Sequence, residues 1–168
     1  MIISLEPWEY IHAHDIGIKR AVANWNVPDK KSYTQGNNQP EMIASPVACI
    51  SELAVAKAIN SYWVGGVWDN RDHGKYRSLP DVAPNIEVRR VRDRDNPISV
   101  WKSGLGKGLI LIATYPIPPE YRQVEILGFI PHDIAWEKAS QSYARRVLPQ
   151  SYLRPIDRLD DFLASQRS

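Results

Sequence analysis

Two carboxylates and one cation close together in the chain could cleave a phosphodiester bond. Asp81 is followed a few residues later by Glu87 and Arg89. Mg²⁺ prefers oxygen ligands and is commonly held by one or two carboxylates together with a substrate phosphate. An ion held by Asp81 and Glu87 could activate a water and stabilise charge on the phosphate oxygens, while Arg89 lies over the same phosphate. These residues therefore predict a site that uses Mg²⁺ or Mn²⁺.

A strand must position this pair of residues. Residues 85–92 interleave β-branched and polar side chains, which predicts a β-strand. Side chains along a strand alternate between its two faces, so we expect Glu87 and Arg89 to point the same way and Arg90 to point the other way. Asp81 lies on a short segment before Pro84, close enough in sequence for its carboxylate to come beside Glu87.

A third acid, Glu52, lies in an apolar, alanine-rich segment that runs from Pro46 to Trp63. This composition predicts a helix that packs into the body of the domain. A carboxylate in such surroundings is costly to bury alone, so we expect Glu52 to be paired, protonated or close to a cation. Lys57 lies roughly 140° around the helix from Glu52, so the two do not form an i,i+4 pair.

The order of these groups resembles that of a known nuclease superfamily. An acid in a helix, then Pro80-Asp81, then Glu87-Val88-Arg89 on a strand is similar to the PD-(D/E)XK, or restriction-endonuclease-like, nucleases. The resemblance covers roughly residues 46 to 130, and the layout also resembles short uncharacterised proteins of tailed phages. It implies an α/β (α+β) fold with a central mixed sheet flanked by helices, and DNA as the substrate.

The same resemblance assigns roles to the candidate residues. Asp81 and Glu87 would be the metal ligands, with Glu52 as the supporting helix acid and third ligand. Arg89 stands where the superfamily usually has a catalytic lysine. Because arginine stays protonated, it can bind phosphate without serving as a base. Lys57 is the residue that could supply a lysine from the helix instead.

Other interpretations of these residues stay open. Asp81, Glu87 and Arg89 are also compatible with a ladder of ion pairs between neighbouring strands. Glu52 could pair with Lys57 or with Arg90. Arginine in place of lysine favours a noncatalytic relative that binds nucleic acid or a protein partner. A third alternative is a structural or interaction protein of a phage that uses exposed Trp and Tyr side chains as anchors.

Composition indicates a single domain, and the net charge indicates that the protein is not a polycation that coats nucleic acid. The 168 residues are 43% hydrophobic and carry a net charge of only +2. DNA binding must therefore come from a local patch, and the best candidate is the group of Arg90, Arg92 and Arg94 beside Arg89. A strand edge protected by charge is the alternative for that group.

Three parts of the single domain 1–168 are expected. These are an N-terminal helix and loop (1–45), a nuclease-like core (46–130) and a C-terminal helical extension (131–168). The first helix is predicted from Pro7 to about Trp25, because apolar residues recur there at helical spacing. Further elements are strands at 85–92, 98–101, 109–115 and 123–130, helices at 132–138 and 155–164, a hairpin turn at 103–108, and loops at 29–40 and 69–77.

Targeting signals and cysteine chemistry are not indicated. The single cysteine, Cys49, excludes an internal disulfide and a cysteine-based zinc site. The first residues lack the basic and apolar segments of a signal peptide, and no apolar run approaches a membrane span. We therefore expect no membrane partner and a cytoplasmic location, which would be the host cytoplasm for a phage protein. Nuclease scaffolds of this type often dimerise, so a homodimer is a further expectation.

Overall fold

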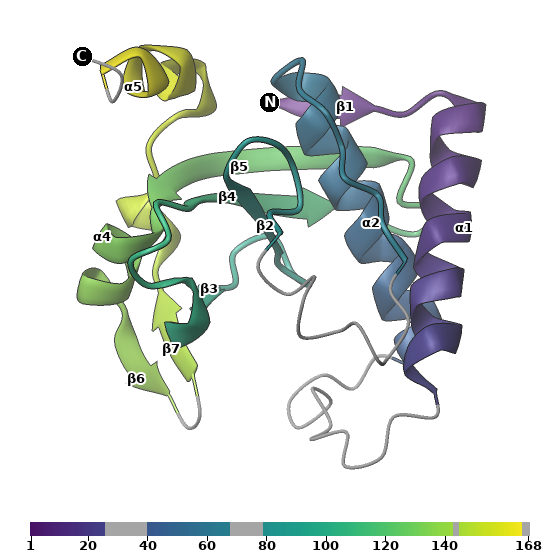
Figure 1. The fold of residues 1–168 in the computed structure, drawn as a ribbon, viewed down its shortest axis with the longest axis horizontal. Coiled ribbons are helices and arrows are strands. Elements are labelled where there is room, and N and C mark those ends of the chain that lie inside the picture. Colours follow the sequence, from purple (N-terminus) through teal and green to yellow (C-terminus); the bar gives the residue numbers. More distant parts are fainter. Residues whose placement is uncertain (26–39, 68–78, 143–144, 166–168) are drawn as a thin grey trace.

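A four-stranded mixed sheet forms the centre of the computed structural model, which describes residues 1–25, 40–67, 79–142 and 145–165. Its strand order is β1-β5-β4-β2, and β2 is parallel to β4 while the other neighbours are antiparallel. The strands are β1 (Ile2–Ser4), β2 (Ile86–Arg90), β4 (Ile110–Pro116) and β5 (Gln123–Pro131). The expected α+β class with a mixed sheet flanked by helices is confirmed (Figure 1).

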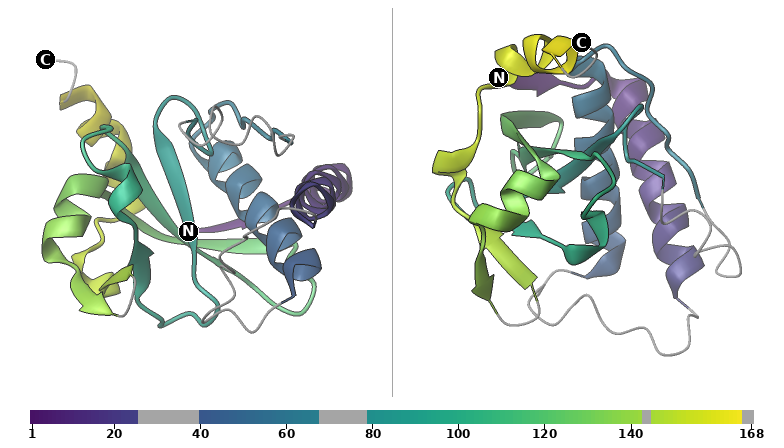
Figure 2. Two further views of the ribbon diagram at one scale, coloured as in Figure 1. Left: turned by 60° about the horizontal axis from the view of Figure 1, so that its bottom comes forward. Right: turned by 60° about the vertical axis from the view of Figure 1, so that its left-hand side comes forward.

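Two long helices cover one face of this sheet. α2 (Glu41–Ala58) packs on the strands, and α1 (Pro7–Asn24) packs on the outer side of α2 (Figure 2). The two helices approach closely because α1 presents small residues to α2. A Cβ atom on Gly17 would lie only 2.3 Å from the Cα of Pro46, so only glycine fits at that crossing.

Helix α2 begins earlier than predicted. The sequence places its start at Pro46, but the helix begins at Glu41 and includes Pro46. Pro46 is the sixth residue of the helix, so it removes one backbone donor from the second turn, and it lies where α1 approaches α2 closely at Gly17. The helix ends at Ala58, so Trp63 lies beyond it.

A smaller layer covers the opposite face of the central sheet. It consists of α4 (His132–Lys138) and a three-stranded antiparallel sheet in the order β3-β7-β6. The strands are β3 (Ile98–Val100), β6 (Ser140–Ser142) and β7 (Arg145–Leu148). Its apolar residues pack against the far side of β4 and β5 in a cluster that includes Val100, Leu111, Ile130 and Leu148.

This second sheet corrects two predictions. The segment 103–108 is not a hairpin turn, because β3 pairs with β7 and not with β4. It includes a short 3-10 turn (Lys102–Gly104) and carries the chain from one sheet to the other. The segment 131–168 is also not purely helical, since it contains β6 and β7 as well as α4, two 3-10 turns (Gln150–Tyr152 and Ile156–Arg158) and α5 (Leu159–Ser165).

Most other predicted elements are present close to their expected positions. The observed bounds of α1, β2, β3, β4, β5 and α4 each agree within a few residues with the sequence pattern. The loops predicted at 29–40 and 69–77 lie almost entirely outside the described residues. Across the described ranges, no helix combines the length and the apolar character needed to cross a membrane.

Candidate functional site

Glu52 on α2 is buried and bound by two donors from other elements. Arg20 of α1 donates from Nη1 to Oε1 at 2.8 Å and to Oε2 at 3.1 Å. The indole Nε1 of Trp63 donates to Oε2 at 2.9 Å. Only 6% of Glu52 is exposed. The expectation that this acid needs a partner is confirmed, but the partner is Arg20 and not Lys57 or Arg90.

The environment of Glu52 favours its protonated form despite this ion pair. Burial raises the pKa of Glu52 to about 7, and the negative charge of Asp81 acts in the same direction. The charge of Arg20 and the hydrogen bonds from Arg20 and Trp63 oppose the shift. Glu52 and Asp81 are therefore close enough for the charge of one to affect the titration of the other.

Backbone pairing brings Asp81 to this place. Val82 forms isolated β-bridges with Trp63 on one side and with Ile86 on the other. The same antiparallel pairing includes a hydrogen bond from the amide of Ala83 to the carbonyl of Tyr62 at 3.0 Å. Asp81 consequently lies between the end of the α2 segment and the edge strand β2, beside the indole that binds Glu52.

Asp81 is tied to strand β2 by its side chain. Its Oδ2 accepts a hydrogen bond from the backbone amide of Val88 at 2.8 Å. Burial raises the pKa of Asp81, while the Val88 amide and the positive charges of Arg89 and Arg20 lower it. Two arginines, one from α1 and one from β2, thus act on the same carboxylate.

Glu87 and Arg89 point to the same face of β2, as the alternation predicted, and form an ion pair with each other. Their side chains are only about one fifth exposed, at 20% and 23%. Ile86 and Val88 are buried in the cluster that includes residues of α2. Glu87 therefore points to the face of the sheet that α2 does not cover.

The predicted gathering of three acids in one metal site is corrected by this geometry. Asp81 lies at the edge of β2, where its charge acts on Glu52 and the charge of Arg89 acts on it, whereas Glu87 lies on the face that α2 does not cover. Within the described part of the chain, no three Asp, Glu, His or Cys side chains are arranged to hold a metal ion. The physical reason is the two-residue period of the strand, which sends Glu87 away from the helix that carries Glu52.

Lys57 does not lie among these groups. Its Nζ contacts Oε2 of Glu9 at 2.6 Å and donates to the carbonyl of Ser4 at 3.1 Å. The lysine therefore ties the end of α2 to the start of α1 and to β1. Its proposed role as a substitute catalytic lysine is not compatible with this position.

The arginines after β2 differ in their surroundings. Arg94 is exposed and forms ion pairs with Glu125 at 2.7 Å and with Asp95 at 3.5 Å. Burial and the charge of Arg92 lower the pKa of Arg90. Arg94 thus lies in a turn after β2 with its charge paired to Glu125 of β5.

Two residues of the site were missed in the sequence, and a third lies close by. Arg20 carries no local signal beyond the requirement that buried Glu52 find a cation. Trp63 was identified only as the last residue of the predicted helical segment that contains Glu52. His132, at the start of α4, is buried beneath Gly104, where a Cβ would lie 2.3 Å from Nε2. Burial and the charge of Arg89 lower the pKa of His132, so the imidazole is close to the Glu87 side of β2.

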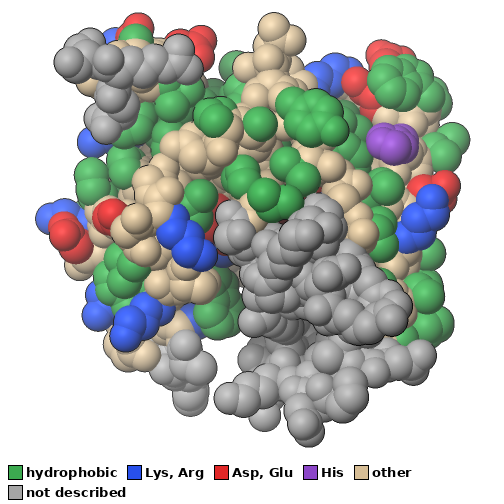
Figure 3. All heavy atoms as spheres, in the orientation of Figure 1, with side chains coloured by type: hydrophobic (Ala, Val, Ile, Leu, Met, Phe, Trp, Pro, Cys, Tyr) green, Lys and Arg blue, Asp and Glu red, His purple; other side chains and the backbone are tan. Residues whose placement is uncertain are grey.

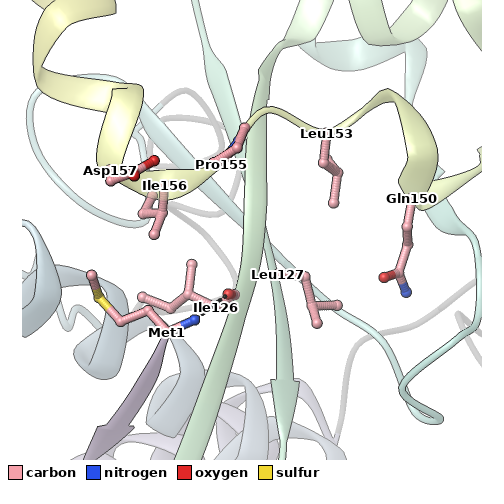
Figure 4. A pocket seen from close by; sticks show the side chains of 8 residues that line it. All are labelled: Met1, Ile126, Leu127, Gln150, Leu153, Pro155, Ile156 and Asp157. Atoms are coloured by element: carbon pink, nitrogen blue, oxygen red, sulfur yellow. Dashed lines mark hydrogen bonds between the residues drawn. The ribbon is translucent and has the colours of Figure 1, made fainter.

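A groove of about 460 Å³ lies elsewhere, between β5 and the C-terminal segment (Figure 4). Its lining combines apolar and polar groups and consists of Met1, Ile126, Leu127, Gln150, Leu153, Pro155, Ile156 and Asp157. None of the candidate acids lies in it. The loop predicted at 69–77, which contains His73, falls outside the described residues.

The identity of the site rests on this geometry alone. The chain matches no protein-family model, no curated protein and no solved structure.

Proposed function

We propose that this protein is a metal-dependent nuclease with a restriction-endonuclease-like core, which hydrolyses phosphodiester bonds of DNA. Asp81 and Glu87 are the metal ligands, Glu52 is the supporting acid, and Arg89 occupies the usual lysine position. One observation carries the proposal. Arg89 forms an ion pair with Glu87, and its charge also lowers the pKa of Asp81, so one cation acts on both proposed ligands.

The oxygen atoms around Arg89 are of the kind that a hard divalent cation prefers as ligands. Carboxylate and carbonyl oxygens are the ligands of Mg²⁺ and Mn²⁺, and Mg²⁺ commonly keeps several of its waters. The amide of Val88 points to Asp81. Since the amide and the carbonyl of one strand residue point to the same side, the Val88 carbonyl also faces this edge. Val88 directly follows Glu87 in the chain, so its carbonyl is a third oxygen at this edge.

The supporting residues hold these donors in place. The hydrogen bond from Val88 fixes one oxygen of Asp81, and burial removes water that would weaken its interaction with a cation. Glu52 lies close enough to Asp81 for their charges to interact, and Arg20 with Trp63 holds the Glu52 carboxylate in position. A bound ion would supply an activated water and charge stabilisation at the phosphate. Arg89 would then be released from Glu87 to contact the phosphate.

Cleavage of plasmid DNA tests the proposal. In the presence of Mg²⁺ or Mn²⁺ the protein should nick supercoiled plasmid. Asp81→Asn and Glu87→Gln should each abolish nicking, because each removes a charged ligand with little change of shape. Glu120→Gln, at an exposed position far along the chain, is the matched control and should cleave normally. Equal nicking by Asp81→Asn, Glu87→Gln and the unaltered protein would remove this site from consideration.

One observation favours a second function. Glu87 is already paired with an arginine that cannot act as a base, which is what a noncatalytic relative that binds nucleic acid would show. Such a protein would retard DNA in a gel without cutting it, with or without a divalent ion. A structural or interaction protein of a phage would neither retard nor cut DNA.

A further inference from the structure

Helix α1 exposes large apolar side chains along the face that points away from α2. The exposed fractions are 68% for Trp8, 61% for Ile11, 47% for Val22 and 66% for Trp25. The opposite face is buried against α2 through small residues, among them Ala13, Gly17 and Ala21. In Figure 3, hydrophobic side chains follow the right-hand edge of the molecule, where α1 lies in this orientation.

The exposed residues belong to one regular stripe. We define the α1 stripe as the positions that follow each other at alternating spacings of three and four along the helix, namely Trp8, Ile11, Asp15, Ile18, Val22 and Trp25. Such spacing is the seam of a coiled coil, in which each residue packs against a second helix. The sequence pattern predicted the helix correctly, but these positions do not face the core of their own domain.

The α1 stripe has nearly the same order of residue types from its N-terminal end as from its C-terminal end. A tryptophan lies at each end of the stripe, and the next position toward the centre is β-branched at both ends. The two central positions are Asp15 and Ile18. In an antiparallel pair of two such helices, Trp8 faces Trp25 of the other copy and Ile11 faces Val22. A two-fold interface requires this pattern. If residue i of the first copy contacts residue j of the second, then residue j of the first copy contacts residue i of the second.

The charges of the α1 stripe fit the same arrangement. Asp15 is exposed at the centre, and Lys19 is exposed beside Ile18. In the antiparallel pair, Asp15 of one copy lies beside Lys19 of the other, and this contact occurs twice. A parallel pair would instead place the two Asp15 carboxylates beside each other, at a position where like charges are destabilising.

We propose that the α1 stripe binds a second copy of this chain, with the two α1 helices antiparallel. This inference goes beyond the proposed nuclease function and does not depend on it. The helical stretch between Trp8 and Trp25 is roughly 25 Å long, so the contact is a small one and the dimer is a weak one. The expectation of a homodimer thereby gains a defined surface.

Sedimentation over a range of concentrations tests the dimer. The mean mass should rise from 19.1 kDa toward twice that value as concentration increases from about 5 to about 200 µM, because association follows mass action. Val22→Glu should hold the protein at the monomer mass without loss of folded structure, since this side chain is exposed. Ile134→Glu, an apolar-to-charged change at an exposed position of α4, is the matched control and should still dimerise.

Charge reversal and cross-linking test the orientation. Asp15→Lys should weaken the dimer, and the double variant Asp15→Lys with Lys19→Asp should restore it. A mixture of Ile11→Cys and Val22→Cys should form a disulfide-linked dimer, whereas each variant alone should not, because like positions are roughly 16 Å apart along an antiparallel pair. The native Cys49 is buried and does not interfere.

Several outcomes would overturn the proposal. A monomer at every concentration would show that the α1 stripe does not bind a second copy, whatever else it binds. A dimer that Val22→Glu leaves intact would place the interface elsewhere. Cross-linking of each single cysteine variant with itself would show a parallel pair. None of these results depends on cleavage of DNA.

Discussion

Arg20 of α1 binds the carboxylate of Glu52 on α2 through one nitrogen, with Nη1 at 2.8 Å from Oε1 and at 3.1 Å from Oε2. Its Nε donates at the same time to the carbonyl of Gly66 at 2.8 Å. One side chain thus joins both long helices and the segment that leads toward Asp81. The ion pair places a positive charge beside Glu52, and this charge also acts on Asp81.

Removal of Arg20 should destabilise the protein in a pH-dependent way. Arg20→Met keeps the apolar part of the side chain but leaves Glu52 buried without its cation, so the free energy of unfolding should fall by about 3 kcal/mol at neutral pH. At pH 5 the loss should be smaller, because Glu52 can take up a proton. Chemical denaturation at both pH values measures this, with Arg122→Met at an exposed position as the control. Equal losses for the two variants would contradict the structural role of the ion pair.

The raised pKa of Glu52 predicts the sign of a stability change with pH. The carboxyl group binds its proton more tightly in the folded state, where its pKa is about 7, than in the unfolded state, where the value is 4.5. Its contribution to stability is therefore fully present below pH 4.5 and is lost as the pH rises through 7. Glu52→Gln removes this contribution. The free energy of unfolding, measured from pH 4 to pH 8, should fall more with rising pH in the unaltered protein than in Glu52→Gln.

Replacement of Arg89 by lysine should increase metal-dependent cleavage. The ion pair with Glu87 competes with a divalent cation for the same carboxylate, and lysine makes a weaker, single-point contact than the guanidinium does. Lysine can also lose its proton when its surroundings lower its pKa, which arginine cannot do. We expect Arg89→Lys to nick plasmid about a hundredfold faster at equal Mg²⁺, which is the lower end of the effect typical for a positioned acid-base group.

Two further variants make this comparison specific. Arg94→Lys changes an exposed arginine that is paired with Glu125, and it should leave the rate unchanged. Arg89→Lys combined with Asp81→Asn should be inactive, since the gain requires the metal ligand. A rate for Arg89→Lys equal to or below that of the unaltered protein would argue that Arg89 does not limit catalysis at this site.

The sequence predicted the elements well because their signals are local. The helix near the N-terminus, the strand with Glu87 and Arg89, and the apolar strand β4 each follow from a periodicity within a short window. The strands β1, β6 and β7 escaped prediction because they are short, and β6 is the polar sequence Ser-Gln-Ser. Such a strand forms only because β7 lies beside it, and no local pattern reports that neighbour.

The candidate site was predicted less completely, for a related reason. Alternation along β2 correctly placed Glu87 and Arg89 on one face, and burial of Glu52 correctly implied a partner. The packing of α1 on α2 decides which cation reaches Glu52. This packing joins residues far apart in the chain, so no local pattern predicts it. The apolar positions of α1 predicted the helix, but helical spacing shows only that an apolar face exists and not whether the same chain or another covers it.

Binding of Mn²⁺ tests the central claim most directly, since it asks about the ligands without requiring catalysis. Titration calorimetry with MnCl₂ should show about one ion bound per chain, with binding abolished in Asp81→Asn and in Glu87→Gln and retained in the exposed variant Glu120→Gln. Absence of Mn²⁺ binding by the unaltered protein, or equal binding by all four proteins, would contradict the assignment of Asp81 and Glu87 as metal ligands.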